Sequence, residues 1–143
     1  MSIKALALET IGPELRAAID ASLDKKAGDV VVLDLRGLAS FTDFFVLCTG
    51  RSNRQLKTIS DAIEDVLTKR RVKPNHIEGY PHGDWLLMDY VDFVVHVFTP
   101  RSRSHYDLER LWGDAGRLEI VGSDPDDRDE SPREIRRDPT KGS

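Results

Sequence analysis

The segment DWLLMDYVDFVVHVF, residues 84–98, decides the fold. It contains two apolar runs, 85–88 and 93–98, and the residues between them, 89–92, are of the types that favour turns. This pattern predicts a hairpin of two strands with an acidic corner. Neither run alternates with polar residues, which is typical of strands covered on both faces in a parallel or mixed sheet flanked by helices.

Helical and extended patterns alternate along the rest of the chain up to residue 121. Apolar residues at three- and four-residue steps predict helices, and short runs of β-branched or aromatic residues predict strands. We expect helices over 12–26 and 53–71, strands over 29–35 and 43–49, an extended segment over 76–78, and a last short helix carrying Leu108, Leu111, Trp112 and Ala115. Residues 1–121 are therefore predicted to form a single α/β domain: a mixed five-stranded sheet with flanking helices. Because three helices are few for five strands, some apolar surface could remain for a partner.

Composition narrows the function classes. The chain has 143 residues, 39% of them hydrophobic, which suits one compact domain. Its formal net charge of −4 lacks the basic excess of proteins that bind mainly to nucleic-acid phosphates. Cys48 is the single cysteine, so no intrachain disulfide can form, and no apolar run has bilayer length. We expect a cytoplasmic protein.

The last 22 residues, 122–143, differ from the rest. They contain seven acidic and five basic residues and three prolines, with Ile135 as the only strongly apolar side chain. Such a segment cannot bury enough surface to offset the entropy of ordering. We predict a disordered charged tail there.

The aspartates of the hairpin admit a metal site as one interpretation. Asp89 and Asp92, with Asp84 nearby and Asp34 and Asp43 on neighbouring strands, could supply oxygen ligands to Mg²⁺. A nucleotidyltransferase would place two carboxylates one residue apart, on the same side of a strand. Asp89 and Asp92 are three apart, so solvated aspartates at a turn are the favoured interpretation, and no metal is expected.

The support for other candidate sites is equally weak. Residues 50–54 end a strand and open a helix, where a phosphate could bind, but Ser52 and Gln55 also fit a helix capping box, which we favour. His96 lies among valines, and a buried, hydrogen-bonded histidine is favoured over a metal ligand because no Cys or second His stands at ligand spacing. We expect no cofactor and no catalytic activity.

Aromatic residues at the hairpin favour a docking surface. Trp and Tyr are the residue types that often dominate interface energy. Trp85, Tyr90 and Val91 could act as apolar anchors, although Trp85 fits a core position as well as an interface. Trp112 shares a stripe with apolar helix residues, so a core position is favoured for it.

One set of short motifs, taken together and in order, is specific: Asp43-Phe44-Phe45, Thr49-Gly50, Ser52-Asn53-Arg54-Gln55, Glu78-Gly79, Asp84-Trp85, Asp89, Asp92, Val94-Val95-His96-Val97-Phe98, and Tyr106, Leu108, Glu109, Leu111 and Trp112. Through this set the chain resembles, over roughly residues 10 to 115, the ribosomal silencing factor family, also called Iojap-like. It differs where the family commonly has glycine in place of Val91 and a pair of tyrosines in place of His105-Tyr106. The tail beyond Val121 has no counterpart in the resemblance.

The resemblance implies a nucleotidyltransferase-like fold without the catalytic motif. It implies a translational repressor that binds large-subunit ribosomal protein fourteen and blocks joining with the small subunit when nutrients are short. The partner-binding residues are then expected to be Trp85, Tyr90 and Val91 as anchors, with Asp89, Asp92 and Glu78 facing basic groups. The sequence does not decide between a monomer and a homodimer. The alternatives are a metal-dependent nucleotidyl or phosphoryl transferase using the hairpin aspartates, and direct rRNA contact through Arg51, Arg54, Arg101 and Arg103.

Overall fold

One mixed sheet organises the molecule. The computed structural model describes residues 8–79, 83–120 and 135–136, and within these ranges six strands of four or more residues and one of two residues pair in the order β3-β4-β5-β2-β1-β6-β7. Only β2 and β5 pair in parallel; the other neighbours are antiparallel. The strands are β1 (Gly28–Asp34), β2 (Phe44–Thr49), β3 (His76–Gly79), β4 (Trp85–Asp89), β5 (Phe93–Phe98), β6 (Gly116–Ile120) and β7 (Ile135–Arg136).

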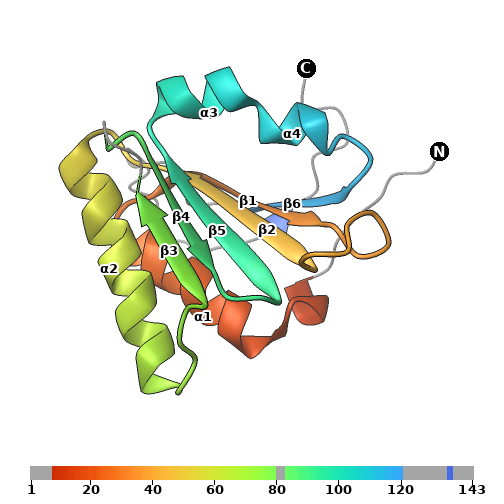
Figure 1. Cartoon of the computed structure of the whole chain (residues 1–143), viewed down its shortest axis with the longest axis horizontal. Helices are drawn as coiled ribbons and strands as arrows, with labels where there is room; N and C mark the ends of the chain where they lie inside the picture. Colours follow the sequence, from red (N-terminus) through yellow and green to blue (C-terminus); the bar gives the residue numbers. More distant parts are fainter. Residues whose placement is uncertain (1–7, 80–82, 121–134, 137–143) are drawn as a thin grey trace.

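Two long helices cover one face of the sheet. They are α1 (Gly12–Asp24), preceded by a short 3₁₀ turn at Leu8–Thr10, and α2 (Asn53–Lys69) (Figure 1). Their apolar stripes pack on the strands to form the larger core, in which Leu15, Ile59 and Val95 are among the most buried residues. No helix in the described part of the chain is long and apolar enough to cross a bilayer.

The opposite face carries much less helix. Among the described helices, α3 (Pro100–Tyr106) and α4 (Leu108–Leu111) lie over it (Figure 1). A smaller core forms beneath them from residues such as Leu33, Leu47 and Phe98, and several partly buried apolar side chains pack at its margin. The prediction of a mixed sheet with flanking helices is therefore confirmed.

The predicted sheet was short by two strands. The last helix was expected to continue to Ala115, but α4 ends at Leu111 and the chain turns into β6, which pairs with β1. Leu118 and Ile120 of β6 are buried in the larger core, whereas Arg117 lies on the other face. The alternation therefore covers too few residues to be recognised in the sequence.

The second unpredicted strand, β7, lies within residues 122–143. Its two residues pair with β6. The remainder of that segment lies outside the described residues, so its disorder stays a prediction.

Candidate protein-docking surface

The alternation of β4 brings three of the predicted partner-binding residues to one face of the sheet. Trp85 and Leu87 pack at the margin of the smaller core, and Asp89 follows on the same side because side chains alternate along a strand. Glu78 of β3 is the cross-strand partner of Leu87 and so shares this face. Met88, between them, points into the larger core. Glu78, Trp85 and Asp89 therefore lie on one face of the sheet.

Trp85 is both a packing residue and a surface residue. Its ring lies 5.1 Å from that of Phe98 and 4.4 Å from that of Tyr106, measured between centroids. Its indole Nε1–H donates a hydrogen bond to Nδ1 of His96 at 3.2 Å. The side chain is nevertheless partly exposed. The interpretations that the sequence left open, core and interface, are thus compatible.

His96 is the buried, hydrogen-bonded histidine that the sequence predicted. It stands in the middle of β5, between Leu87 of β4 and Leu47 of β2. Only 3% of its surface is exposed, and burial lowers its pKa to about 3, so the imidazole is neutral at physiological pH. Its ring meets that of Phe45 at a centroid distance of 4.5 Å.

The corner between β4 and β5 is fixed by hydrogen bonds. Val91 has φ of +74°, the left-handed region that glycine occupies most easily, and its side chain is 56% exposed. Its amide donates to Oδ1 of Asp89 at 2.8 Å, and its carbonyl accepts from Oγ1 of Thr42 at 2.8 Å. The carbonyl of exposed Asp92 accepts from the amide of Asp43 at 3.1 Å. The corner is therefore held against the loop that precedes β2.

The hairpin carboxylates do not assemble a metal centre in the structure as described. Asp89 directs one oxygen to the backbone of its own turn. Among residues 8–79, 83–120 and 135–136, no group of three or more His, Cys, Asp or Glu side chains is placed to hold a metal ion.

Tyr90 corrects the predicted site. Its side chain is 6% exposed and belongs to the larger core, where its ring stacks on that of Phe93 at 5.2 Å. Desolvation, together with the charge of Glu64, raises its pKa to about 12. Because side chains alternate along the chain at the end of β4, Tyr90 lies on the same side as Met88, away from the face that carries Trp85. In this structure it is a core residue, not a surface anchor.

Sequence reasoning missed most of the exposed apolar side chains on this side of the molecule. Phe41 is 59% exposed, Tyr106 49% and Leu111 70%. The ring of Trp112, predicted to be core, is only partly buried and lies 6.1 Å from those of Phe41 and Phe45. The sequence indicated this exposed apolar surface in one way, because three predicted helices were too few to cover five predicted strands. We define the aromatic face as Phe41, Trp85, Leu87, Tyr106, Leu111 and Trp112.

An ion-pair network holds α3 and α4 in place beside this face. Glu109 of α4 contacts Arg103 of α3 at 3.0 Å and Arg117 of β6 at 3.1 Å, and Arg103 also donates to the carbonyl of Asp29 at 2.6 Å. Burial alone would raise the pKa of Glu109, but the hydrogen bonds and charges of the two arginines outweigh it and hold the pKa below its ordinary value. Arg103 is committed to this network, which removes it from the predicted rRNA-binding set.

The predicted helix cap is confirmed at the start of α2. The amide of Gln55 donates to Oγ of Ser52 at 3.1 Å, and Oε1 of Gln55 accepts from the amide of Arg51 at 2.7 Å. The first half of a capping box is therefore present, whereas the Gln55 side chain accepts from Arg51, the residue before the N-cap Ser52. These residues have a structural role that needs no phosphate.

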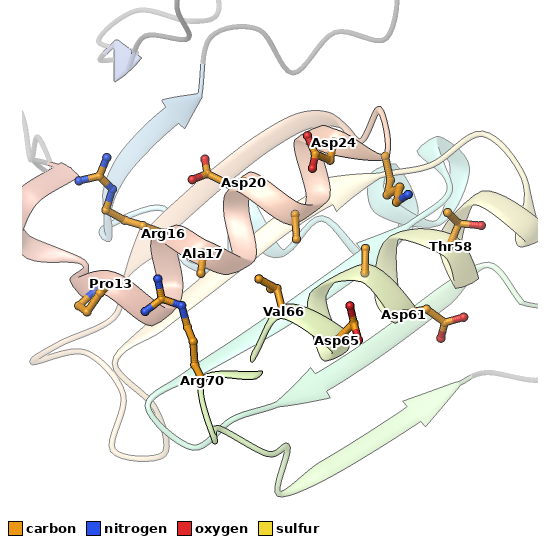
Figure 2. A pocket seen from close by; sticks show the side chains of 13 residues that line it. Pro13, Arg16, Ala17, Asp20, Asp24, Thr58, Asp61, Asp65, Val66 and Arg70 are labelled. Atoms are coloured by element: carbon orange, nitrogen blue, oxygen red, sulfur yellow. The ribbon is translucent and has the colours of Figure 1, made fainter. Parts of the chain in front are cut away.

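A groove of about 900 Å³ lies between α1 and α2, on the opposite side of the sheet from the aromatic face. Figure 2 shows Asp20 and Asp24 along α1, Asp61 and Asp65 along α2, and arginines at one end. Asp61 pairs with Lys57 at 3.1 Å, and Asp65 with Lys69 at 3.3 Å, in exposed i,i+4 contacts typical of a solvated helix surface. None of the predicted site residues lines this groove.

Fold and surface together define a class: an α/β protein with one helix-covered face and one largely open apolar face suited to docking. Comparison with known proteins identifies the family within this class.

The family model described as ribosomal silencing factor during starvation matches residues 9–142. Ribosomal silencing factor RsfS of Halalkalibacterium halodurans is 40% identical over 108 residues, covering 76% of this chain and 92% of that protein. The Bacillus subtilis protein of the same name is 40% identical over 101 residues, covering 71% and 86%.

A solved structure agrees. The crystal structure of a protein from Chromobacterium violaceum superposes with a TM-score of 0.67 at 38% identity, covering 70% of this chain and 83% of that one. The chain belongs to the ribosomal silencing factor family. The family match reaches residue 142, further than the resemblance, which had no counterpart for the tail beyond Val121.

Proposed function

We propose that this protein represses translation by binding the large ribosomal subunit and preventing it from joining the small subunit under nutrient limitation. Membership of the ribosomal silencing factor family supports a silencing role at the ribosome. The partner we propose is ribosomal protein fourteen of the large subunit, and the place of action is the cytoplasm.

The aromatic face is the observation that carries this proposal. Exposed apolar side chains gather there beside a sheet face that carries, in the described part of the chain, two short helices. Contiguous apolar surface of this kind marks sites of protein association. Trp85 is the proposed central anchor because its ring is held by aromatic neighbours while part of it stays exposed. Val91, exposed at the corner, is a second proposed anchor.

Acidic residues border the anchors. Glu78 and Asp92 are exposed, and Asp89 shares the face of Trp85. Together with the formal net charge of −4, they complement a basic ribosomal protein and disfavour capture by rRNA phosphates elsewhere. A minor rRNA contact through exposed Arg51, Arg54 and Arg101 is part of the proposal, and it predicts binding that weakens with salt.

The proposed mechanism is steric. A protein of 16.1 kDa bound where the two subunits meet excludes the small subunit by occupying its volume. No group has to transfer protons or electrons for this effect. Repression should therefore follow occupancy of the large subunit.

Co-sedimentation with purified large subunits tests the surface. Replacing Trp85 with Ala should weaken binding by about 30-fold, the equivalent of about 2 kcal/mol for a central aromatic anchor. Leu111→Ala tests the same face with little effect on folding, because Leu111 is 70% exposed. Ile77→Ala is the matched control: Ile77 is 39% exposed, but it pairs with Met88 and lies on the opposite face. Unchanged binding by folded Trp85→Ala protein, or equal losses in the Leu111 and Ile77 variants, would contradict this surface.

A further inference from the structure

His96 is an unusual residue for the centre of a sheet. It belongs to β5, the strand that lies between β4 and β2 in Figure 1. It is 3% exposed, and its neighbours on β5 are valines. Aromatic rings surround it: Phe45 at 4.5 Å, Phe98 at 5.8 Å and Trp85 at 5.8 Å between centroids. An apolar side chain would fill such a position without desolvating any polar atom.

The hydrogen bond with Trp85 defines the state of the imidazole. The indole Nε1–H can only donate, so Nδ1 of His96 must accept, at 3.2 Å. A neutral imidazole that accepts at Nδ1 carries its proton on Nε2. The buried ring is neutral at physiological pH, which keeps this acceptor available.

The other nitrogen gives histidine no structural advantage here. Nε2 is buried and has no hydrogen-bond partner among the described residues. An unpaired buried donor is rare and destabilising. What distinguishes His96 from an apolar residue is therefore its bond to the indole of Trp85.

We propose that His96 is a positioning residue for the docking of Trp85. By holding the indole N–H, it fixes the orientation of a partly exposed tryptophan before the partner arrives, which lowers the entropy cost of ordering the ring on binding. Because the N–H is already satisfied within the protein, the partner's contact with Trp85 is apolar and needs no hydrogen-bond acceptor. This inference rests on the proposed function, since it assumes that Trp85 docks on ribosomal protein fourteen.

A matched pair of polar substitutions tests the inference. The side-chain amide of His96→Asn places its oxygen near the position of Nδ1, whereas that of His96→Gln extends towards the position of Nε2. We expect His96→Asn to bind purified large subunits within about twofold of wild type, and His96→Gln to bind about 5- to 10-fold more weakly, the usual value of one hydrogen bond. In a Trp85→Phe background, which lacks the donor, the two substitutions should bind equally. Equal affinities of the Asn and Gln variants in the wild-type background would overturn the inference.

A spectroscopic measurement on the unaltered protein provides an independent test. In a ¹H–¹⁵N spectrum, the indole N–H of Trp85, assigned with a Trp112→Phe variant, should exchange with solvent at least about tenfold more slowly than a free indole, because it is hydrogen-bonded. Exchange at the free rate would overturn the inference even if both His96 variants failed to fold. The proposed function fails separately: if Trp85→Ala binds normally, the docking surface is wrong, whereas loss of binding in Trp85→Ala with equal Asn and Gln variants removes only the role of His96.

Discussion

Val91→Gly should stabilise the protein. Val91 holds a φ of +74° at the corner between β4 and β5. The left-handed conformation costs a residue with a Cβ about 1–2 kcal/mol, and glycine avoids that cost. Glycine also has more freedom in the unfolded chain, which offsets about 0.5–1 kcal/mol of the gain. Since the side chain is 56% exposed, little burial is lost, and the net increase in the free energy of unfolding should be about 0.5–1 kcal/mol.

Urea denaturation followed by circular dichroism measures this change, and the midpoint of thermal unfolding should rise by a few degrees. Val91→Ala is the matched control, because alanine removes the same methyl groups but keeps the strained Cβ. If the glycine variant were no more stable than the alanine variant, backbone strain at the corner would not be the controlling factor. Binding to large subunits should fall in both variants if Val91 is an anchor, which separates its role in docking from its strain.

Three further predictions concern stability. Between pH 6.5 and about 3, His96 binds a proton in the unfolded chain but not in the folded one, so the free energy of unfolding should fall as pH drops below 6.5, by up to about 1.4 kcal/mol per pH unit. In urea titrations, His96→Asn should show a smaller decrease per pH unit than the wild type. An equal decrease in both proteins would exclude His96 as the cause. Glu109→Gln should lower the free energy of unfolding by about 1–3 kcal/mol, because it leaves Arg103, whose side chain is 11% exposed, without its charge partner; a loss below about 0.5 kcal/mol by denaturation would contradict the importance of that network. Ser52→Ala should cost about 1 kcal/mol by removing the hydroxyl that accepts from the Gln55 amide, and unchanged stability in the same assay would show that the cap contributes nothing.

The elements with long, regular patterns could be predicted from the sequence. The apolar runs of β2 and β5 predicted central strands, and both strands are buried at every position. The helix α2 begins at its predicted cap, Ser52. β6 was missed because only two of its five residues, Leu118 and Ile120, are buried, and because Ala115 fitted the end of a helical stripe. The helix ends before Gly113 because the residues that follow, 116–120, pair with β1. That pairing is a tertiary contact, which the local sequence pattern does not reveal.

The candidate site was harder to predict than the fold. Strand alternation predicts which residues of β4 share a face with Trp85. It does not predict which of the two faces the long helices cover, so the sequence left the exposure of Trp85 undecided. Tyr90 was assigned to the surface because it stands at a turn, yet it continues the alternation of β4 on the side of Met88, so its ring lies in the larger core. Phe41 and Trp112 lie far apart in the sequence, and their packing in the folded chain brings them to one surface.

The central claim is that occupation of the large subunit through the aromatic face prevents subunit joining. The most direct measurement mixes purified small and large subunits with increasing amounts of the protein and follows complete ribosomes on sucrose gradients. The account predicts that complete ribosomes decline in proportion to the protein bound to large subunits, and that folded Trp85→Ala protein, at the same concentration, leaves them intact. If joining proceeded normally on large subunits saturated with the wild-type protein, the steric mechanism would be wrong.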